Sequence, residues 1–140
     1  MRAHPSGSRL ARILDVRRVD VLLVEDDRDF RDVVEVLLSR EGFRVSTADD
    51  GAEALLRLKE HHPSVLLVDL MLPRMSGEAF RAEQLASEDL ASIPFVVVSG
   101  REDAQAVADR LHADAFVPKP ADFEEIVALV RRFTGRESTH

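Results

Sequence analysis

Short apolar runs recur along this 140-residue chain and alternate with segments in which apolar residues have helical spacing. Five strands are predicted, at Val19–Val24, Phe43–Ala48, Val65–Asp69, Phe95–Ser99 and Ala115–Pro118. The first, third and fourth of these runs are almost wholly apolar, as expected of strands that helices cover on both faces. The alternation therefore predicts an α/β fold around a parallel sheet.

Apolar residues in the intervening segments repeat at helical spacing. The first two helices carry Phe30, Val33, Val34, Leu37 and Leu38, and then Ala54, Leu55 and Leu58. Asp27 or Asp29 is expected to cap the first helix, and Asp50 the second. A third helix should begin near Gly77, a fourth near Asp103, and a fifth should span residues 122–133. Five successive strand–helix units predict a doubly wound sheet.

The composition is that of one soluble domain without a membrane span or a disulfide framework. There are no cysteines, which excludes disulfides and thiolate zinc sites and suits a reducing cytoplasm. Residues 1–20 carry a local charge of +3 and the other 120 residues carry −10. So acidic a body disfavours binding to nucleic acid. We expect a flexible basic extension at residues 1–18, a folded domain at 19–134 and a tail at 135–140.

Charged residues stand at the ends of three of the predicted strands. Glu25 and Asp26 follow the first, Asp69 ends the third, and Lys119 follows the fifth. Ligands of open parallel sheets bind beyond the carboxyl ends of the strands, so these residues are expected to share a pocket. Three carboxylates close together favour a bound hard cation such as Mg²⁺. Taken singly, each acid has a simpler explanation, as a helix cap or a strand end.

Four motifs in this order resemble the receiver domain of the two-component response-regulator family. They are Glu25-Asp26, Asp69-Leu70-Met71-Leu72-Pro73 with Gly77 following, Val96-Val97-Val98-Ser99-Gly100, and Lys119-Pro120. The resemblance covers residues 19–134. It implies a flavodoxin-like (βα)5 fold with a five-stranded parallel sheet in the order 2-1-3-4-5, and a cytoplasmic signalling protein.

The resemblance also implies a role for each residue of the pocket. Asp69 would accept a phosphoryl group from a histidine kinase or a phosphotransfer protein. Asp26, Asp69 and the backbone carbonyl of Met71 would hold Mg²⁺ or Mn²⁺, with Glu25 acting directly or through water. Lys119 and Ser99 would contact the phosphoryl oxygens, and the Lys119-Pro120 peptide bond is expected to be cis.

Signal output is expected to follow from the same resemblance. Ser99 would move toward the phosphoryl group, and Phe116 would turn inward behind it. Because phenylalanine lacks a hydroxyl group, we expect the inward rotamer of Phe116 to be populated before phosphorylation, unless Phe116 is simply permanent core. A downstream protein would contact the surface formed by the helix near Asp103, the strand Ala115–Pro118 and the helix at 122–133. The chain would be a monomer or a weak, phosphorylation-dependent homodimer, and His112 would replace a glycine that usually ends the fourth helix.

Three alternatives compete with a phosphorylation switch whose only chemistry is its own phosphorylation and dephosphorylation. A receiver-like protein-binding module that is never phosphorylated typically lacks part of the set of residues that is complete here. A metal-dependent aspartyl phosphatase would have a second acid two residues after its nucleophile, where this chain has Met71. A flavin or dinucleotide carrier would need a glycine-rich phosphate loop, which the sequence lacks.

Overall fold

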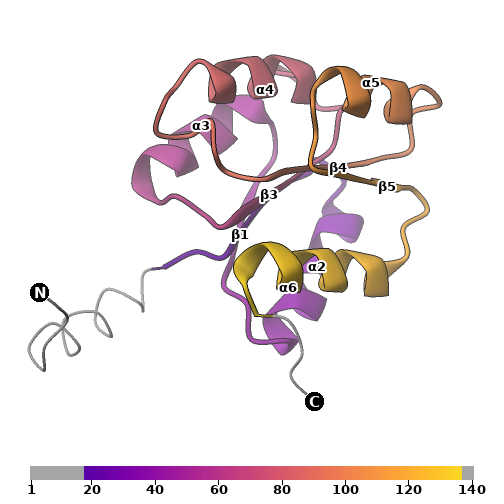
Figure 1. The fold of residues 1–140 in the computed structure, drawn as a ribbon. Coiled ribbons are helices and arrows are strands. Elements are labelled where there is room, and N and C mark those ends of the chain that lie inside the picture. The colour runs from indigo at the N-terminus through magenta and orange to yellow at the C-terminus, as the bar shows by residue number, and fades with distance from the viewer. Residues whose placement is uncertain (1–17, 137–140) are drawn as a thin grey trace, which may run out of the picture.

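A single parallel sheet runs through the computed structural model, which describes residues 18–136. Its strands are β1 (Val21–Val24), β2 (Val45–Ala48), β3 (Val65–Val68), β4 (Phe95–Ser99) and β5 (Ala115–Pro118). Their order is β2-β1-β3-β4-β5, and every neighbouring pair is parallel (Figure 1). The predicted flavodoxin-like fold is confirmed. The expected basic extension lies outside the described residues except for Arg18.

Helices cover both faces of the sheet. They are α2 (Arg28–Arg40), α3 (Gly51–Glu60), α4 (Gly77–Leu85), α5 (Ala104–Arg110) and α6 (Phe123–Thr134). Figure 1 shows α2 and α6 on one face and α3, α4 and α5 on the other. No helix within residues 18–136 is long and apolar enough to cross a membrane.

Successive residues of the central strands belong to two separate cores, one on each face. In β1, Leu22 and Val24 join the core under α3, α4 and α5, whereas Val21 and Leu23 join the core under α2 and α6. This alternation follows from the two-residue period of a strand. It explains why β1 and β3 contain no polar residue, because each side chain is buried whichever way it points.

Acidic side chains begin the two helices nearest to β1 and β2. Asp27 caps α2 by accepting hydrogen bonds from the backbone N–H groups of Asp29 and Phe30. Asp50 caps α3 by accepting from the N–H of Glu53. Asp27, rather than Asp29, is therefore the cap of the first helix, since Asp29 already lies inside it.

Three of the expected strand boundaries were wrong. The first strand begins at Val21, not Val19, and the second at Val45, not Phe43. The Phe43 N–H donates to Leu38 O at the end of α2, so this residue closes the helix before the strand begins. Asp69 lies just beyond β3, although its N–H still bonds to Val24 O.

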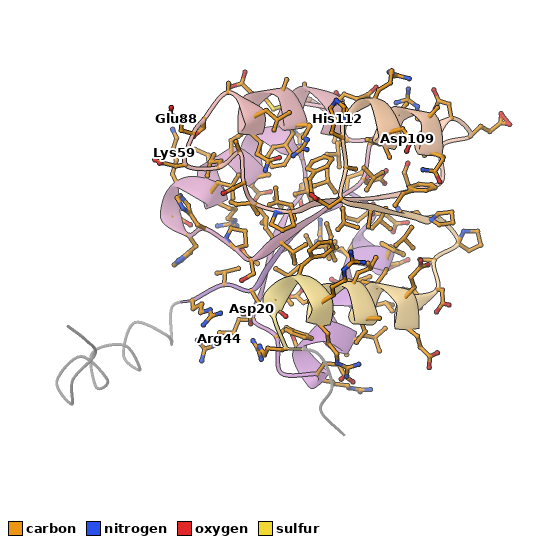
Figure 2. All side chains as sticks on the ribbon, viewed as in Figure 1. Asp20, Arg44, Lys59, Glu88, Asp109 and His112 are labelled. Atoms are coloured by element: carbon orange, nitrogen blue, oxygen red, sulfur yellow. The ribbon has the colours of Figure 1, made fainter. Side chains whose placement is uncertain are left out.

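The end of α5 is held by a buried arginine from α4. His112 (Figure 2) follows α5 after Leu111. Its φ is 55°, a left-handed conformation that glycine adopts more readily. Arg81 donates from Nε to Leu111 O and from Nη2 to His112 O, each over 3.0 Å, and from Nη1 to Gln84 Oε1 over 2.8 Å. Burial lowers the pKa of Arg81, against the smaller effect of the Asp114 charge. The two bonds from Arg81 to Leu111 O and His112 O satisfy carbonyls that the end of α5 leaves without helical partners.

Candidate functional site

The carboxyl ends of β1, β3 and β5 bring two carboxylates and one ammonium group into contact. Lys119 Nζ lies 2.7 Å from Glu25 Oε1 and 3.0 Å from Asp69 Oδ2. Glu25 is 1% exposed and Asp69 6%, whereas the neighbouring Asp26 is exposed. Residues up to 94 positions apart therefore meet because parallel strands end at the same edge.

Backbone contacts fix the position of Asp69 and Lys119. The N–H of Lys119 donates to Ser99 O over 3.0 Å, and the Lys119-Pro120 peptide bond is cis. The N–H of Met71 donates to Asp69 Oδ1 over 3.0 Å, which orients the carboxylate. Gly77, at the start of α4, lies against the backbone of Asp69: a Cβ atom there would be 2.6 Å from Asp69 O. Only glycine allows this close approach.

The charges of the pocket are unbalanced in favour of the acids. Burial raises the pKa of Glu25, the hydrogen bond from Lys119 opposes this rise, and the charge of Asp69 adds to it. Burial by itself would lower the pKa of Lys119, but its hydrogen bonds to Glu25 and Asp69 and the charges of both outweigh burial, so the pKa is raised. Three acids against one lysine leave an excess of negative charge that a cation would relieve.

The acidic residues have the chemistry of a site for a hard divalent cation. One carboxylate oxygen from each of Glu25, Asp26 and Asp69 lies within 4.8 Å of the other two. Mg²⁺ prefers such oxygens, accepts one or two carboxylates, and keeps several waters. The exposed position of Asp26 suits an ion that remains partly hydrated. The Met71 peptide, whose N–H binds Asp69, also lies beside this cluster.

Ser99 ends β4, the strand next to β3, and Phe116 lies on β5, the strand beyond β4. Ser99 is 1% exposed, and its hydroxyl oxygen accepts a hydrogen bond from the N–H of Arg101 over 3.3 Å. Arg101 joins two helices, through contacts of 3.1 Å with Glu78 and 2.6 Å with Asp103. Phe116 is partly buried and packs against the core under α3, α4 and α5.

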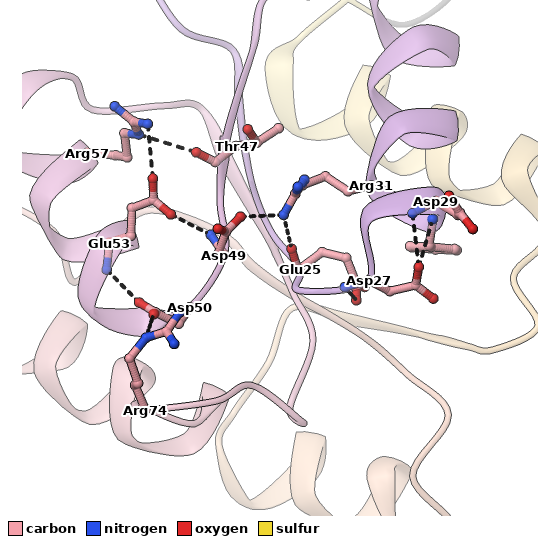
Figure 3. Close-up of polar contacts among 11 residues, drawn as sticks. Glu25, Asp27, Asp29, Arg31, Thr47, Asp49, Asp50, Glu53, Arg57 and Arg74 are labelled. Carbon is pink, nitrogen blue, oxygen red and sulfur yellow. Dashed lines mark hydrogen bonds and ion pairs between the residues drawn. The ribbon is translucent and has the colours of Figure 1, made fainter.

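A chain of polar contacts frames the pocket on the side of β2 (Figure 3). Arg31 donates from Nη1 to Glu25 O over 2.9 Å and also binds the carboxylate of Asp49. The N–H of Asp49 donates to Glu53 Oε1 over 2.7 Å. Arg74, in the loop after β3, binds the capping carboxylate of Asp50. These contacts tie the ends of β1, β2 and β3 together.

Sequence patterns indicated the acids and the lysine but missed their supporting residues. Phe30 was assigned only to the apolar face of its helix, yet Lys119 Nζ lies 4.4 Å from the centroid of its ring. Arg31 and Arg74 drew no attention, since single arginines on a surface helix or loop have no distinctive spacing. A basic residue one helical turn after an acidic strand end is the only available signal for Arg31.

Comparison with known proteins decides the family of this fold and site. A sequence model described as the response regulator receiver domain matches residues 21–131. The chain belongs to the response-regulator receiver-domain family. It is the receiver domain of a response regulator of two-component signalling, a family whose members act as phosphoacceptor switches.

Individual relatives support the same assignment. The sensory transduction protein RegX3 of Mycolicibacterium smegmatis is 35% identical over 83% of this chain and 50% of its own length. A response regulator receiver protein from Pseudomonas putida has a TM-score of 0.75 and 30% identity, over 82% of this chain and 97% of that one. The chain spans about half the length of the curated relatives it matches.

One structural neighbour contains a metal ion. The receiver domain of a sensor histidine kinase from Pseudomonas aeruginosa has a TM-score of 0.75 and 24% identity, over 84% of this chain and 98% of that one. Its structure has a magnesium ion coordinated in the active site cleft. At this identity, the likeness shows that the two proteins share a fold.

Proposed function

We propose that Asp69 is the phosphoacceptor of this receiver domain and that its donor is the phosphohistidine of a histidine kinase or a phosphotransfer protein. The observation that carries this proposal is the contact of Lys119 with both Glu25 and Asp69, beside the exposed Asp26. A buried carboxylate with an ammonium group and a cation site beside it is equipped for phosphoryl transfer.

Glu25, Asp26, Asp69 and the backbone carbonyl of Met71 would hold Mg²⁺, with Glu25 acting directly or through water. The magnesium in the neighbouring receiver structure supports this choice, and Mn²⁺ is the alternative ion. When bound, the cation would screen the repulsion between the carboxylate and the incoming phosphoryl group.

In the transfer step, an oxygen of Asp69 forms a bond to phosphorus while the bond between phosphorus and the donor nitrogen breaks. Lys119, already 3.0 Å from Asp69 Oδ2, neutralises charge on the phosphoryl oxygens. Ser99 donates its hydroxyl hydrogen to another of these oxygens, after its side chain has moved toward the phosphoryl group. The product is an acyl phosphate, which water returns to the carboxylate.

Phosphorylation would be transmitted to the surface formed by α5, β5 and α6. Ser99 and Phe116 lie on the neighbouring strands β4 and β5, so a movement of one leaves space for the other. This surface would bind a downstream protein, and the receiver would act as a monomer or a weak, phosphorylation-dependent homodimer. We assign residues 19–134 to the receiver unit, with residues 1–18 and 135–140 outside it, and place the protein in the cytoplasm.

The test is incubation with Mg²⁺ and acetyl phosphate followed by intact mass measurement. Wild-type protein should gain one labile phosphoryl group and Asp69→Asn none. Asp89→Asn, the same substitution at an exposed loop residue, should be labelled like the wild type. Equal labelling of Asp69→Asn would move the acceptor elsewhere, and absence of labelling by either acetyl phosphate or a phosphorylated kinase would favour an unphosphorylated protein-binding module.

A further inference from the structure

The ammonium group of Lys119 has an aromatic neighbour as well as two carboxylates. Its Nζ lies 4.4 Å from the centroid of the Phe30 ring, well inside the distance of about 6 Å at which a ring face attracts a cation. Glu25 and Asp69 accept two of the three N–H bonds of this ammonium. The ring lies against the same group and supplies the remaining close contact with electron-rich atoms.

The position of the Phe30 ring is fixed from three directions. Phe30 lies in the first turn of α2, where its N–H donates to the capping carboxylate of Asp27 over 3.2 Å. The N–H of Asp27 in turn donates to Glu25 Oε2 over 3.0 Å. The centroid of the Phe123 ring, at the start of α6, lies 5.8 Å from that of Phe30, so the two rings pack together. Glu25 thus holds both the ammonium group and the turn that carries the ring.

We infer that Phe30 is a positioning residue for Lys119: its ring holds the ammonium group at the phosphoacceptor and covers it against water. This role rests on the proposed phosphoryl transfer to Asp69. Glu25 and Asp69 exchange contacts when a cation and a phosphoryl group arrive, because both can then bind other partners. A neutral ring does not compete for phosphoryl oxygens, so it can hold the ammonium group before, during and after transfer.

The test separates the electrostatic effect of the ring from its bulk. Phe30 is replaced by phenylalanines carrying one, two and three ring fluorines, which weaken the attraction to cations while nearly preserving shape. The initial rate of phosphorylation by acetyl phosphate with Mg²⁺ should fall stepwise along this series. Phe30→Leu should be slower by about three- to tenfold, the range expected for losing one such contact.

A spectroscopic measurement tests the geometry without any phosphorylation. The ring current of Phe30 should shift the ε-methylene protons of Lys119 upfield in the wild type, and this shift should disappear in Phe30→Leu. Phe133→Leu is the matched control. Phe133 packs against the same apolar core as Phe30, but it lies near the other end of α6 and its ring contacts Arg132 instead of Lys119. Phe133→Leu should change neither the rate of phosphorylation nor the chemical shifts of the Lys119 ε-methylene protons.

The outcomes distinguish this inference from the proposed function. Wild-type protein that is labelled at the same rate as every fluorinated variant would overturn the role of Phe30 and leave Asp69 as the acceptor. Identical Lys119 ε-methylene shifts in the wild type and Phe30→Leu would also overturn it. Absence of labelling in the wild type would count against the acceptor itself, and the proton shifts would still decide whether the ring holds the lysine.

Discussion

Gly77→Ala should displace the backbone of Asp69, although it adds only one methyl group. A Cβ atom at Gly77 would lie 2.6 Å from Asp69 O and 2.9 Å from Leu70 Cα, both of them backbone atoms. Ordinary contacts begin at 3.4 Å, so the backbone around Asp69 or the start of α4 must move by about 0.8 Å. No flexible side chain is available there to absorb the shift.

Two consequences follow from that displacement. Overpacking of this kind costs about 1–3 kcal/mol of unfolding free energy. A reacting group misplaced by roughly 1 Å can lose up to about a hundredfold in rate. We therefore expect Gly77→Ala to unfold at lower urea concentration and to be phosphorylated by acetyl phosphate about ten to a hundred times more slowly.

The matched control is Gly100→Ala, at a glycine on the other side of the pocket. A Cβ atom there would have Lys119 Cβ as its nearest contact, at an ordinary 3.4 Å. This variant should retain both stability and rate. Replacing glycine by alanine where the backbone allows it stabilises a protein by about 0.4–1 kcal/mol. A Gly77→Ala protein that is more stable than the wild type and equally fast would therefore refute the reasoning.

Two further substitutions test the contacts that hold the frame of the domain. Arg81→Met removes two hydrogen bonds at the end of α5 and one to Gln84. It should lower the unfolding free energy by about 2–4 kcal/mol, measured by urea denaturation. Arg110→Met, at an exposed position of α5, should change it by less than about 0.5 kcal/mol, and equal effects of the two would contradict the role of Arg81. The hydrogen bond from the N–H of Glu53, helped by Arg74, lowers the pKa of Asp50 in the folded protein. The stability that this carboxylate contributes is therefore present above its pKa in the unfolded chain, and it is lost as the pH falls through its pKa in the folded protein. Asp50→Asn, which can still cap α3, should be less stable than the wild type at neutral pH and equally stable well below about pH 4. If the difference in unfolding free energy between the two proteins persists in acid, the carboxylate charge is not its cause.

Much of the fold was predictable because local and global preferences agree. The residues of β1 and β3, and all of β4 except Ser99, are apolar on both faces, which only a sheet covered by helices on both sides accommodates. Asp27 and Asp50 mark the beginnings of their helices through local hydrogen bonds. The start of β1 was misplaced because Asp20 takes part in tertiary contacts that propensity does not contain, and the start of β2 because the N–H of Phe43 still bonds to the end of α2. Asp20, for example, lies beside Arg44 (Figure 2) and accepts a hydrogen bond from its N–H. Asp20 also accepts a hydrogen bond from Arg136.

In the candidate site, too, some residues could be predicted from the sequence and others could not. Glu25, Asp69 and Lys119 follow strands, so topology alone brings them to one edge. The contact of Phe30 with Lys119 could not be predicted, because it depends on the register of α2 against α6 and on the turn fixed by Asp27. A phenylalanine with helical spacing indicates burial and carries no information about which charge lies beside its ring.

The most direct measurement locates the phosphoryl group on the chain. Protein treated with acetyl phosphate and Mg²⁺ is reduced with borohydride, which converts an aspartyl phosphate to homoserine, and is then sequenced by tandem mass spectrometry. We expect homoserine at position 69, and only in samples that contained the divalent ion. Reduction at another acidic residue, or equal modification of position 69 with the ion chelated, would contradict it.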